Sequence, residues 1–335
     1  MRRWVAWVLA TVMAAGCGTA AAAPGPAASP AACTPLTIPS PALSAATPRN
    51  DPTPGFALAI GASPVGIAVA GGYVWAAETG SSKLVAIRVS DGSQREYSLP
   101  SSQLGFNLAV AADGRIWTAE QYRGAIAGVA LDGSVRECKL GKGAGPVGVA
   151  TAADGTLWVT ESDAGAVARL KPGTAAFETF KMPTGGGQPT EVLPVAGGAY
   201  VTQIAGDSVI HLSNSGQVTE IPLGVSRPQA IGLLQAPDGA LWVAEFGADR
   251  LARISGGQVT QVAFPAGSKP QSLAVSGGRL LVTSSGGDRI DSVDLASGAF
   301  AAGPHTGRWP DHLALAPDGS AWFTEYYGGR VARLP

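Results

Sequence analysis

A phrase of residues that recurs seven times constrains this chain more than any other feature. Each copy opens as Pro-x-Gly-Ile/Val-Ala or a close variant, and most continue through Asp-Gly to a segment like Leu-Trp-Val-Thr-Glu. The copies open at Pro64, Gly105, Pro146, Pro189, Pro228, Pro270 and Pro310, and an aromatic-rich column follows at Trp75, Trp117, Trp158, Tyr200, Trp242, Leu281 and Trp322. Successive openings lie 39 to 43 residues apart. This period, built from short alternating segments, is typical of β-propeller blades.

The third copy shows how one repeat predicts four antiparallel strands. Residues 147–151 form an apolar run suited to a buried inner strand, and Asp154-Gly155 is a hairpin signal. Residues 157–161 are aromatic and β-branched, 166–170 alternate, and 177–180 make a more polar outer strand. A single blade cannot bury its own faces, so the Trp column is expected to pack blade against blade.

The ends of the array indicate how the ring closes. The seventh copy stops after its third strand, and residues 56–60 resemble an outer strand such as 96–99. We expect this N-terminal strand to complete the last blade, which leaves no open edge at the seam. The prediction is an all-β fold: a seven-bladed β-propeller of four-stranded blades over residues 54–335.

Residues 1–53 carry signals for export. A basic start, Met1-Arg-Arg, precedes an apolar stretch too short to span a bilayer, so residues 1–23 are predicted to be a signal peptide. The run Ala14-Ala-Gly-Cys17 resembles a lipoprotein box with Cys17 acylated, and ordinary cleavage within residues 20–23 is the alternative. Residues 24–53 are rich in Ala, Pro and Ser and are predicted to be a disordered tether. We therefore expect an exported protein, anchored in the envelope through Cys17 or secreted.

Cysteine and charge content exclude several classes of partner. Cys33 lies in the predicted tether and Cys138 in a predicted outer strand; whether they pair is left open. No CxxC motif or Cys/His cluster is present, which argues against a zinc or iron–sulfur site. The formal net charge is −1 with 14% charged residues, so nucleic-acid binding has no support. We expect a monomer that binds a small-molecule or cell-envelope ligand, with a lipid anchor as the one link to a membrane.

Two columns of residues are predicted to meet at the mouth of the central channel. The residue after each opening position is apolar in the first three copies and polar in the last four, which points to a polar site on the later blades. It is Val65, Phe106, Val147, Thr190, Gln229, Gln271 and Asp311. The second column closes the second strand with Glu in five copies, and its repetition favours a structural role. It is Glu78, Glu120, Glu161, Gln203, Glu245, Ser284 and Glu325.

The last blade carries the residues most suited to chemistry. Asp311 and Glu325 are two carboxylates that could hold Mg²⁺, the one cofactor we consider, and His312 is a candidate general base. The alternative is that Asp311 caps a strand end and His312 is a satisfied inner-strand residue. Around them, Thr190, Gln229 and Gln271 are candidate substrate-binding residues. Trp309 and Tyr326, with Tyr122, Phe246 and Tyr327, are candidate aromatic platforms at the rim.

The repeated phrases resemble those of the virginiamycin B lyase family. The resemblance rests on residues 155–161, 239–245 and 320–325, on the Pro-x-Gly-Ile/Val-Ala openings and on the third strands of the form Gly-x-Val-Ala-Arg-Leu, and it covers about residues 55–335. It implies a seven-bladed propeller and, for members with the activity, opening of the ester ring of type B streptogramins by elimination. That reaction would use Mg²⁺ on carboxylates, a His base and a second His at the substrate.

The chain departs from the family pattern at three of four functional positions. The two family histidines follow the opening Pro of the last two blades, where this chain has Gln271 and Asp311, and one metal-binding Glu corresponds to Trp309. Glu325 matches the other metal-binding carboxylate. His312 is one residue out of register, which on a regular strand reverses the side that a residue faces. Two hypotheses follow: a metal-assisted lyase acting on a lactone or ester, and a non-catalytic, envelope-anchored binding propeller.

Overall fold

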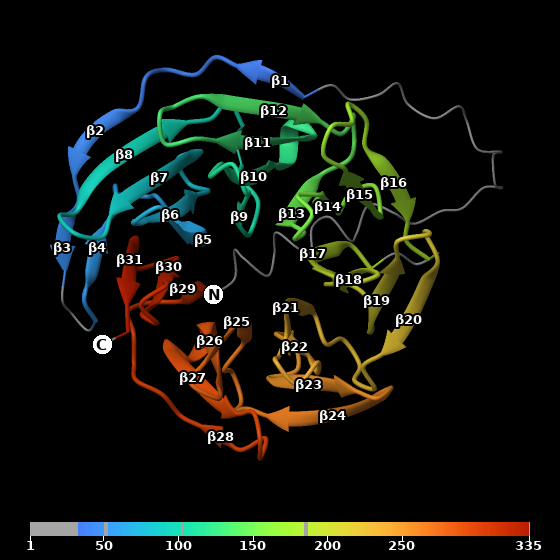
Figure 1. Cartoon of the computed structure of the whole chain (residues 1–335). Coiled ribbons are helices and arrows are strands. Elements are labelled where there is room, and N and C mark those ends of the chain that lie inside the picture. The colour runs from blue at the N-terminus through green and yellow to red at the C-terminus, as the bar shows by residue number, and fades with distance from the viewer. Residues whose placement is uncertain (1–32, 50–52, 102, 184–186, 335) are drawn as a thin grey trace.

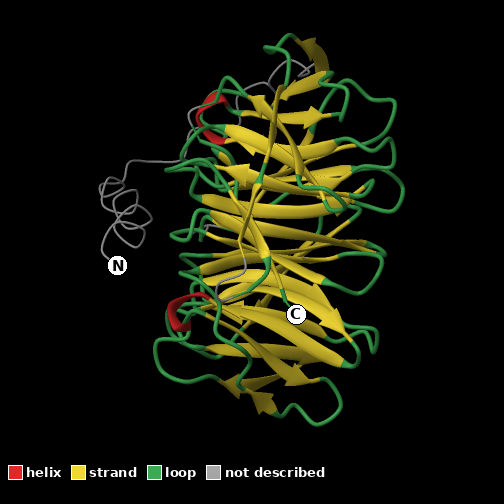
Figure 2. Ribbon diagram, turned by 90° about the vertical axis from the view of Figure 1, so that its left-hand side faces the viewer, coloured by secondary structure: helices red, strands yellow, loops and turns green. Residues whose placement is uncertain are grey.

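The repeats fold into a ring of seven antiparallel sheets around a central channel. The computed structural model describes residues 33–49, 53–101, 103–183 and 187–334, and the predicted signal peptide and Cys17 lie outside these ranges. Figure 1 shows the ring viewed along its axis, and Figure 2 shows the disc edge-on with both short 3-10 helices, η2 (Gln121–Arg123) and η3 (Ser285–Gly287), on one face. The predicted seven-bladed β-propeller is confirmed. Within the described residues no helix is long and apolar enough to cross a membrane.

Each blade runs from an inner strand at the channel to an outer strand at the rim of the disc. In blades 1 to 4 these strands are β5 (Pro64–Ala70), β6 (Tyr73–Glu78), β7 (Lys83–Arg88) and β8 (Ser93–Ser98); β9 (Ala109–Val110), β10 (Ile116–Glu120), β11 (Ala125–Val129) and β12 (Val135–Lys139); β13 (Pro146–Thr151), β14 (Leu157–Glu161), β15 (Ala166–Leu170) and β16 (Glu178–Lys181); β17 (Pro189–Val195), β18 (Gly198–Gln203), β19 (Ser208–Ser213) and β20 (Val218–Pro222). In blades 5 to 7 they are β21 (Ala230–Gln235), β22 (Leu241–Glu245), β23 (Arg250–Ser255) and β24 (Gln258–Ala263); β25 (Pro270–Ser276), β26 (Arg279–Ser284), β27 (Arg289–Asp294) and β28 (Phe300–Ala301); β29 (Pro310–Leu315), β30 (Ala321–Glu325), β31 (Arg330–Arg333) and β4 (Gly55–Ala57).

The apolar core lies between the blades, as the Trp column predicts. Trp158, for example, packs with Val167 of its own blade and with Val201 and Ile210 of the next. The five tryptophans of the column are all buried, with exposed fractions of 0 to 4%. They therefore act as core residues of the blade interfaces.

The ring closes where the N-terminal strand joins the last blade. β4 pairs antiparallel with β31, with Phe56 opposite Val331, so the predicted closure is confirmed. The ring of Phe56 stacks on Trp322 with centroids 6.1 Å apart, and both pack against the first blade. The seam between blades 7 and 1 is thus sealed by backbone pairing and by apolar contacts.

The prediction of a disordered tether over residues 24–53 is wrong for its described part. Three short strands, β1 (Cys33–Leu36), β2 (Ala42–Ala45) and β3 (Thr47–Arg49), pair with the outer strands β12, β8 and β4. This strap, residues 33–49, adds a fifth strand to blades 2, 1 and 7 and runs around the outside of the disc (Figure 1). A low apolar content does not prevent this arrangement, because an outer edge binds a neighbour through backbone N–H and C=O groups.

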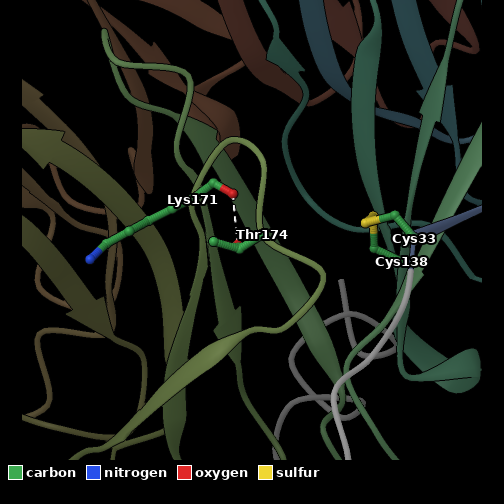
Figure 3. Close-up of a disulfide and its surroundings, with 4 residues drawn as sticks. All are labelled: Cys33, Cys138, Lys171 and Thr174. Carbon is green, nitrogen blue, oxygen red and sulfur yellow. Dashed lines mark hydrogen bonds between the residues drawn. A yellow bond between two sulfur atoms is a disulfide. The ribbon is translucent and has the colours of Figure 1, made fainter.

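A disulfide fixes the start of the strap. Cys33 and Cys138 lie opposite each other in the β1–β12 pair and are joined by a bond that spans 105 residues of sequence (Figure 3). Cys138 is fully buried, whereas Cys33 lines a cavity of about 420 Å³ beside the loop that carries Lys171 and Thr174. The pairing that the sequence left open is therefore present.

Loss of the disulfide should destabilise the whole ring. In the chain-entropy view, closing a loop of about 100 residues contributes about 4.7 kcal/mol, and typical disulfides contribute about 2–4 kcal/mol, so Cys33→Ser or reduction should lower the free energy of unfolding by an amount in this range. Denaturant unfolding with and without reductant measures the change. The double variant Cys33→Ser/Cys138→Ser is the control and should not respond to reductant. Identical unfolding curves for oxidised and reduced wild-type protein would contradict a stabilising role.

Candidate functional site at the channel mouth

Six of the seven inner strands carry a bulge directly after their opening residue. In blade 7, Pro310 pairs with Glu325 and Leu313 with Phe323, so Asp311 and His312 together oppose the single residue Thr324. Blades 1, 3, 4, 5 and 6 show the same register shift. A bulge breaks the alternation of side chains along a strand. For this reason the one-residue offset of His312 does not send its side chain away from that of Asp311.

A threonine hydroxyl repairs each of four bulges and ties it to the next blade. Thr324 accepts the N–H of His312 at 3.1 Å and donates to the carbonyl of Val65 in blade 1 at 2.6 Å. Thr160, Thr202 and Thr283 make the equivalent pair of bonds in blades 3, 4 and 6. The bulged N–H groups, which the strand ladder leaves unpaired, are satisfied in this way.

The same register corrects the alignment of the fifth repeat. Ala230, not Pro228, pairs with Glu245, and the hydroxyl of Thr202 donates to the carbonyl of Ile231. Ile231 therefore occupies the first mouth column of blade 5. Gln229 lies before β21, with a φ of 47°, and its side chain sits against Gly247 of the rim turn. The polar stretch of the column thus begins with Thr190 but is interrupted by an isoleucine.

A chain of buried polar side chains joins blades 6 and 7. Ser285 donates to Gln271 at 3.2 Å, and the amide of Gln271 donates to Asp311 Oδ1 at 2.9 Å. The same oxygen lies 2.6 Å from Nδ1 of His312. Two predicted site residues from the last blade, Asp311 and His312, are therefore brought together, with Gln271 from the neighbouring blade.

Glu191 of blade 4 completes this network and was not a sequence-based candidate. Its Oε1 lies 3.2 Å from Nε2 of His312, so the contact joins β17 to β29, two inner strands that lie at the channel (Figure 1). Glu191 also accepts the N–H of Leu233 at 3.4 Å. The signal that points to it is the column two residues after each opening, where Gly66, Gly148 and Gly232 stand in other copies. A carboxylate replaces that glycine in blade 4, and an imidazole replaces it in blade 7.

The two carboxylates decide the charge of His312. Burial alone would lower its pKa, but hydrogen bonds and charge interactions with Asp311 and Glu191 outweigh burial and raise the pKa from 6.5 to about 10. The side chain is only 7% exposed, and both ring nitrogens are engaged. At neutral pH His312 is therefore an imidazolium held between two carboxylates, and it has no lone pair with which to accept a proton.

Glu325 belongs to a different network from Asp311 and His312. Its Oε2 accepts from Nε of Arg330 at 2.8 Å, and its Oε1 accepts from the N–H of Gly307 at 3.0 Å. Arg330 in turn binds Thr53, next to the N-terminal strand. In blade 7 the second column therefore ties a loop to the end of a strand instead of facing the mouth. Gln203 does the same in blade 4, where its side chain accepts the N–H of Gly187.

These residues do not fit a divalent metal ion. Both oxygens of Glu325 are occupied by an arginine and a backbone N–H, and Asp311 is bound to an imidazolium. Trp309 offers no ligand in the position of the other metal-binding carboxylate that the family resemblance implies. Among the described residues no group of three or more His, Cys, Asp or Glu could hold a metal ion. Mg²⁺ prefers several oxygen ligands in octahedral geometry, and the donor set required for it is not assembled.

The remaining glutamates of the second column are buried with raised pKa values. Glu161 is 5% exposed, and burial raises its pKa to about 7, with a smaller opposing effect from the charge of Lys181. Glu120 is fully buried, and burial together with the charge of Glu137 raises its pKa to about 7. Neither side chain joins the network around His312, so these values reflect buried strand ends.

Thr190 is also structural in this arrangement. Its side chain is buried, its hydroxyl donates to the carbonyl of Gln188 at 3.1 Å, and its own carbonyl accepts from Thr160. It therefore holds the entry to β17 rather than joining Gln271 and Asp311.

Four of the five predicted aromatic residues gather over blades 5 and 7, whereas Tyr122 lies in η2 of blade 2. Trp309 lies 6.3 Å from Phe246 and 5.7 Å from Tyr327, which packs edge-on against Tyr326 at 4.8 Å. Lys269 lies over Phe246 and Arg308 over Tyr327, each within 6 Å of the ring centroid. We call these four aromatic residues the aromatic rim. It places cations and ring faces side by side at the end of the channel that the polar network occupies.

Fold and site together define a seven-bladed β-propeller with a buried polar network at one end of its ring. A family model described as the virginiamycin B lyase family matches residues 52–231 and 195–335. The chain belongs to this family.

Individual relatives agree with this assignment. A virginiamycin B lyase of Nocardia farcinica is 32% identical over 169 residues, which is 50% of this chain and 57% of that protein. A catalytically inactive histidine-to-alanine variant of virginiamycin B lyase from Staphylococcus aureus, solved with quinupristin, superposes with a TM-score of 0.76 at 21% identity, covering 83% of this chain and 97% of that one. A streptogramin B lyase structure gives a TM-score of 0.78 at 21% identity, covering 88% and 98%. At these identities the structures support the fold alone.

Replacing Glu191 by Gln should lower the pKa of His312. The change removes one of the two carboxylates at the imidazole, and a neighbouring charge commonly shifts a pKa by about 1 unit or more. NMR titration can follow the imidazoles individually, because the chain has three histidines. Glu178→Gln, which alters a carboxylate paired with Arg169, is the control and should leave His312 unchanged.

The same change should alter the pH dependence of stability. The folded pKa of His312 lies above the unfolded value of 6.5, so its stabilisation is complete below pH 6.5 and is lost as the pH rises through about 10. Over this window the free energy of unfolding should fall more steeply in wild-type protein than in Glu191→Gln. A His312 that titrates near 6.5 in wild-type protein would contradict the binding of its imidazole between Asp311 and Glu191.

Proposed function

We propose that this chain is a non-catalytic ligand-binding propeller of the virginiamycin B lyase family. The observation that carries the proposal is the engagement of both nitrogens of His312 by Asp311 and Glu191. An imidazolium in that position cannot remove the proton that an elimination requires. The occupied oxygens of Glu325 support the same conclusion, because the described part of the chain contains no group of three or more His, Cys, Asp or Glu that could hold a metal ion to stabilise developing negative charge.

The proposed ligand is an aromatic molecule of the size of a type B streptogramin, bound at the aromatic rim. Ring faces and adjacent cations recognise aromatic groups and hydrogen-bond acceptors. The inactive Staphylococcus aureus variant solved with quinupristin supports the idea that a propeller of this shape can hold such a ligand without cleaving it. Gln271, a predicted substrate-binding residue, is buried and bonded to Ser285 and Asp311, so we propose that it positions the mouth rather than contacting the ligand directly.

We also propose export to an oxidising compartment, where the ligand would be met outside the cytoplasm. The Cys33–Cys138 bond supports this location, because structural disulfides form and persist in such environments. Attachment through Cys17 remains the proposed route to the envelope, with secretion as the alternative.

Quinupristin is the direct probe of this function. The purified protein should bind it, as measured by calorimetry, and mass spectrometry should find no ring-opened product with or without Mg²⁺. Tyr327→Ala should weaken binding about tenfold, because one aromatic contact is lost. Tyr122→Ala is the matched control, since Tyr122 is also exposed but belongs to blade 2.

Two results would overturn the proposal. A ring-opened product that depends on Mg²⁺ would show the metal-assisted lyase of the other hypothesis. A failure of quinupristin to bind at its solubility limit would remove the proposed ligand class.

A further inference from the structure

A recess lies between blades 2 and 3, on the same face of the disc as the aromatic rim but away from it. Its volume is about 330 Å³, and it is formed by the rim turn of blade 2, the linker from blade 2 to blade 3 and one residue of the rim turn of blade 3. The residues are Gln121, Tyr122, Arg123, Gly124, Lys139, Gly141, Lys142, Gly143, Gly145 and Asp163. We call it the linker recess.

The charges around the linker recess are mostly positive. Three cations, Arg123, Lys139 and Lys142, face one carboxylate, Asp163, in a chain whose formal net charge is −1. Among the described residues neither lysine has an ion-pair partner. Arg123 binds Glu137 through Nε and Nη2, and its Nε also lies 3.8 Å from Glu120, so two buried carboxylates compensate its charge. The positive charge left without an ion-pair partner among the described residues is therefore that of Lys139 and Lys142.

The backbone of the linker holds this charge in place. Gly143 has a φ of 79°, the value that the third residue of a type II turn requires, and the N–H of Ala144 reaches the carbonyl of Gly141 at 3.4 Å. Lys142 is thus the second residue of a tight turn. At Gly145 a Cβ atom would lie 2.2 Å from Oδ2 of Asp163, so only glycine lets that carboxylate pack against the linker. Backbone bonds from Leu140 and Gly141 to Gly124 join the linker to the rim turn.

The recess is larger than a simple anion needs. Its volume corresponds to about ten water molecules at about 30 Å³ each. Tyr122, whose residue surface is 56% exposed, lines it beside the cations. A ligand that fills it would combine a compact anionic group with a small ring or sugar that covers the tyrosine.

We propose that the linker recess binds a phosphate monoester. The ammonium groups of Lys139 and Lys142 hold the phosphate group together with the Nη1 group of Arg123. Charge-assisted hydrogen bonds from ammonium and guanidinium groups are the strongest that the surface offers to an oxyanion. The organic part of the ester lies on Tyr122. This site is separate from the proposed ligand site on blades 5 to 7 and does not depend on it.

Phenyl phosphate tests the proposal on the purified protein, with calorimetry or NMR as the readout. Wild-type protein should bind it more tightly than inorganic phosphate, and phenol alone should not bind. Lys139→Gln/Lys142→Gln should weaken binding at least about tenfold, because two charge-assisted contacts are lost. Binding to wild-type protein should also weaken as salt is raised. Lys171→Gln/Lys181→Gln, which changes exposed lysines of blade 3 outside the recess, is the control and should bind as wild type does.

Tyrosine variants separate the two proposed sites. Tyr122→Ala should weaken the binding of phenyl phosphate and leave quinupristin unaffected, whereas Tyr327→Ala should do the reverse. All these substitutions are at exposed positions, and equal thermal midpoints would show that the fold is intact. The proposal is overturned if phenyl phosphate does not bind at millimolar concentration, or if the Lys139→Gln/Lys142→Gln protein binds it as tightly as wild type.

Discussion

The hydrogen bond of a buried threonine hydroxyl across four of the blade interfaces is the interaction on which this mouth depends. Thr160, Thr202, Thr283 and Thr324 each accept an N–H from a bulged inner strand and donate to the next inner strand. A bulge leaves backbone groups unpaired, and unpaired buried groups are costly. The hydroxyl satisfies them and sets the spacing of adjacent blades at the same time. In blade 7 it also bridges the seam, because Thr324 reaches Val65 in the first blade.

The bulges determine what the mouth can do chemically. On a regular strand Asp311 and His312 would face opposite ways, but the bulge lets the carboxylate bind the imidazole of the next residue. The other ring nitrogen reaches Glu191 from blade 4. A histidine held in this way joins blades 4 and 7 through its two ring nitrogens. Gln271 and Asp311, which stand where the family pattern has histidines, are thus both members of this buried network.

The repeat period was sufficient to predict the propeller, its blade count, the burial of the Trp column and closure by residues near Phe56. Alignment by sequence failed in blade 5, where Pro228 precedes the true start of the strand at Ala230, since proline can stand before a strand as well as at its first position. Glu191 was missed because its column is glycine in three of the seven copies and suggests no chemistry, and a bulge is needed before such a residue can meet His312. The strap at residues 33–49 pairs through backbone groups, which leave little trace in side-chain composition. The predicted Mg²⁺ ligands are each suited to the ion, but only the fold shows that Arg330 binds Glu325 instead.

Replacement of Thr324 by Val tests the central claim most directly, because valine keeps the shape of the side chain and removes its hydroxyl. The account predicts that the free energy of unfolding falls by about 1–3 kcal/mol, since the N–H of His312 and the carbonyl of Val65 both lose their partner. Thr118→Val is the matched control: Thr118 is equally buried in blade 2, but its hydroxyl has no partner among the described residues, so the change should cost little. Equal losses of stability in the two variants, measured by denaturant unfolding, would contradict the account.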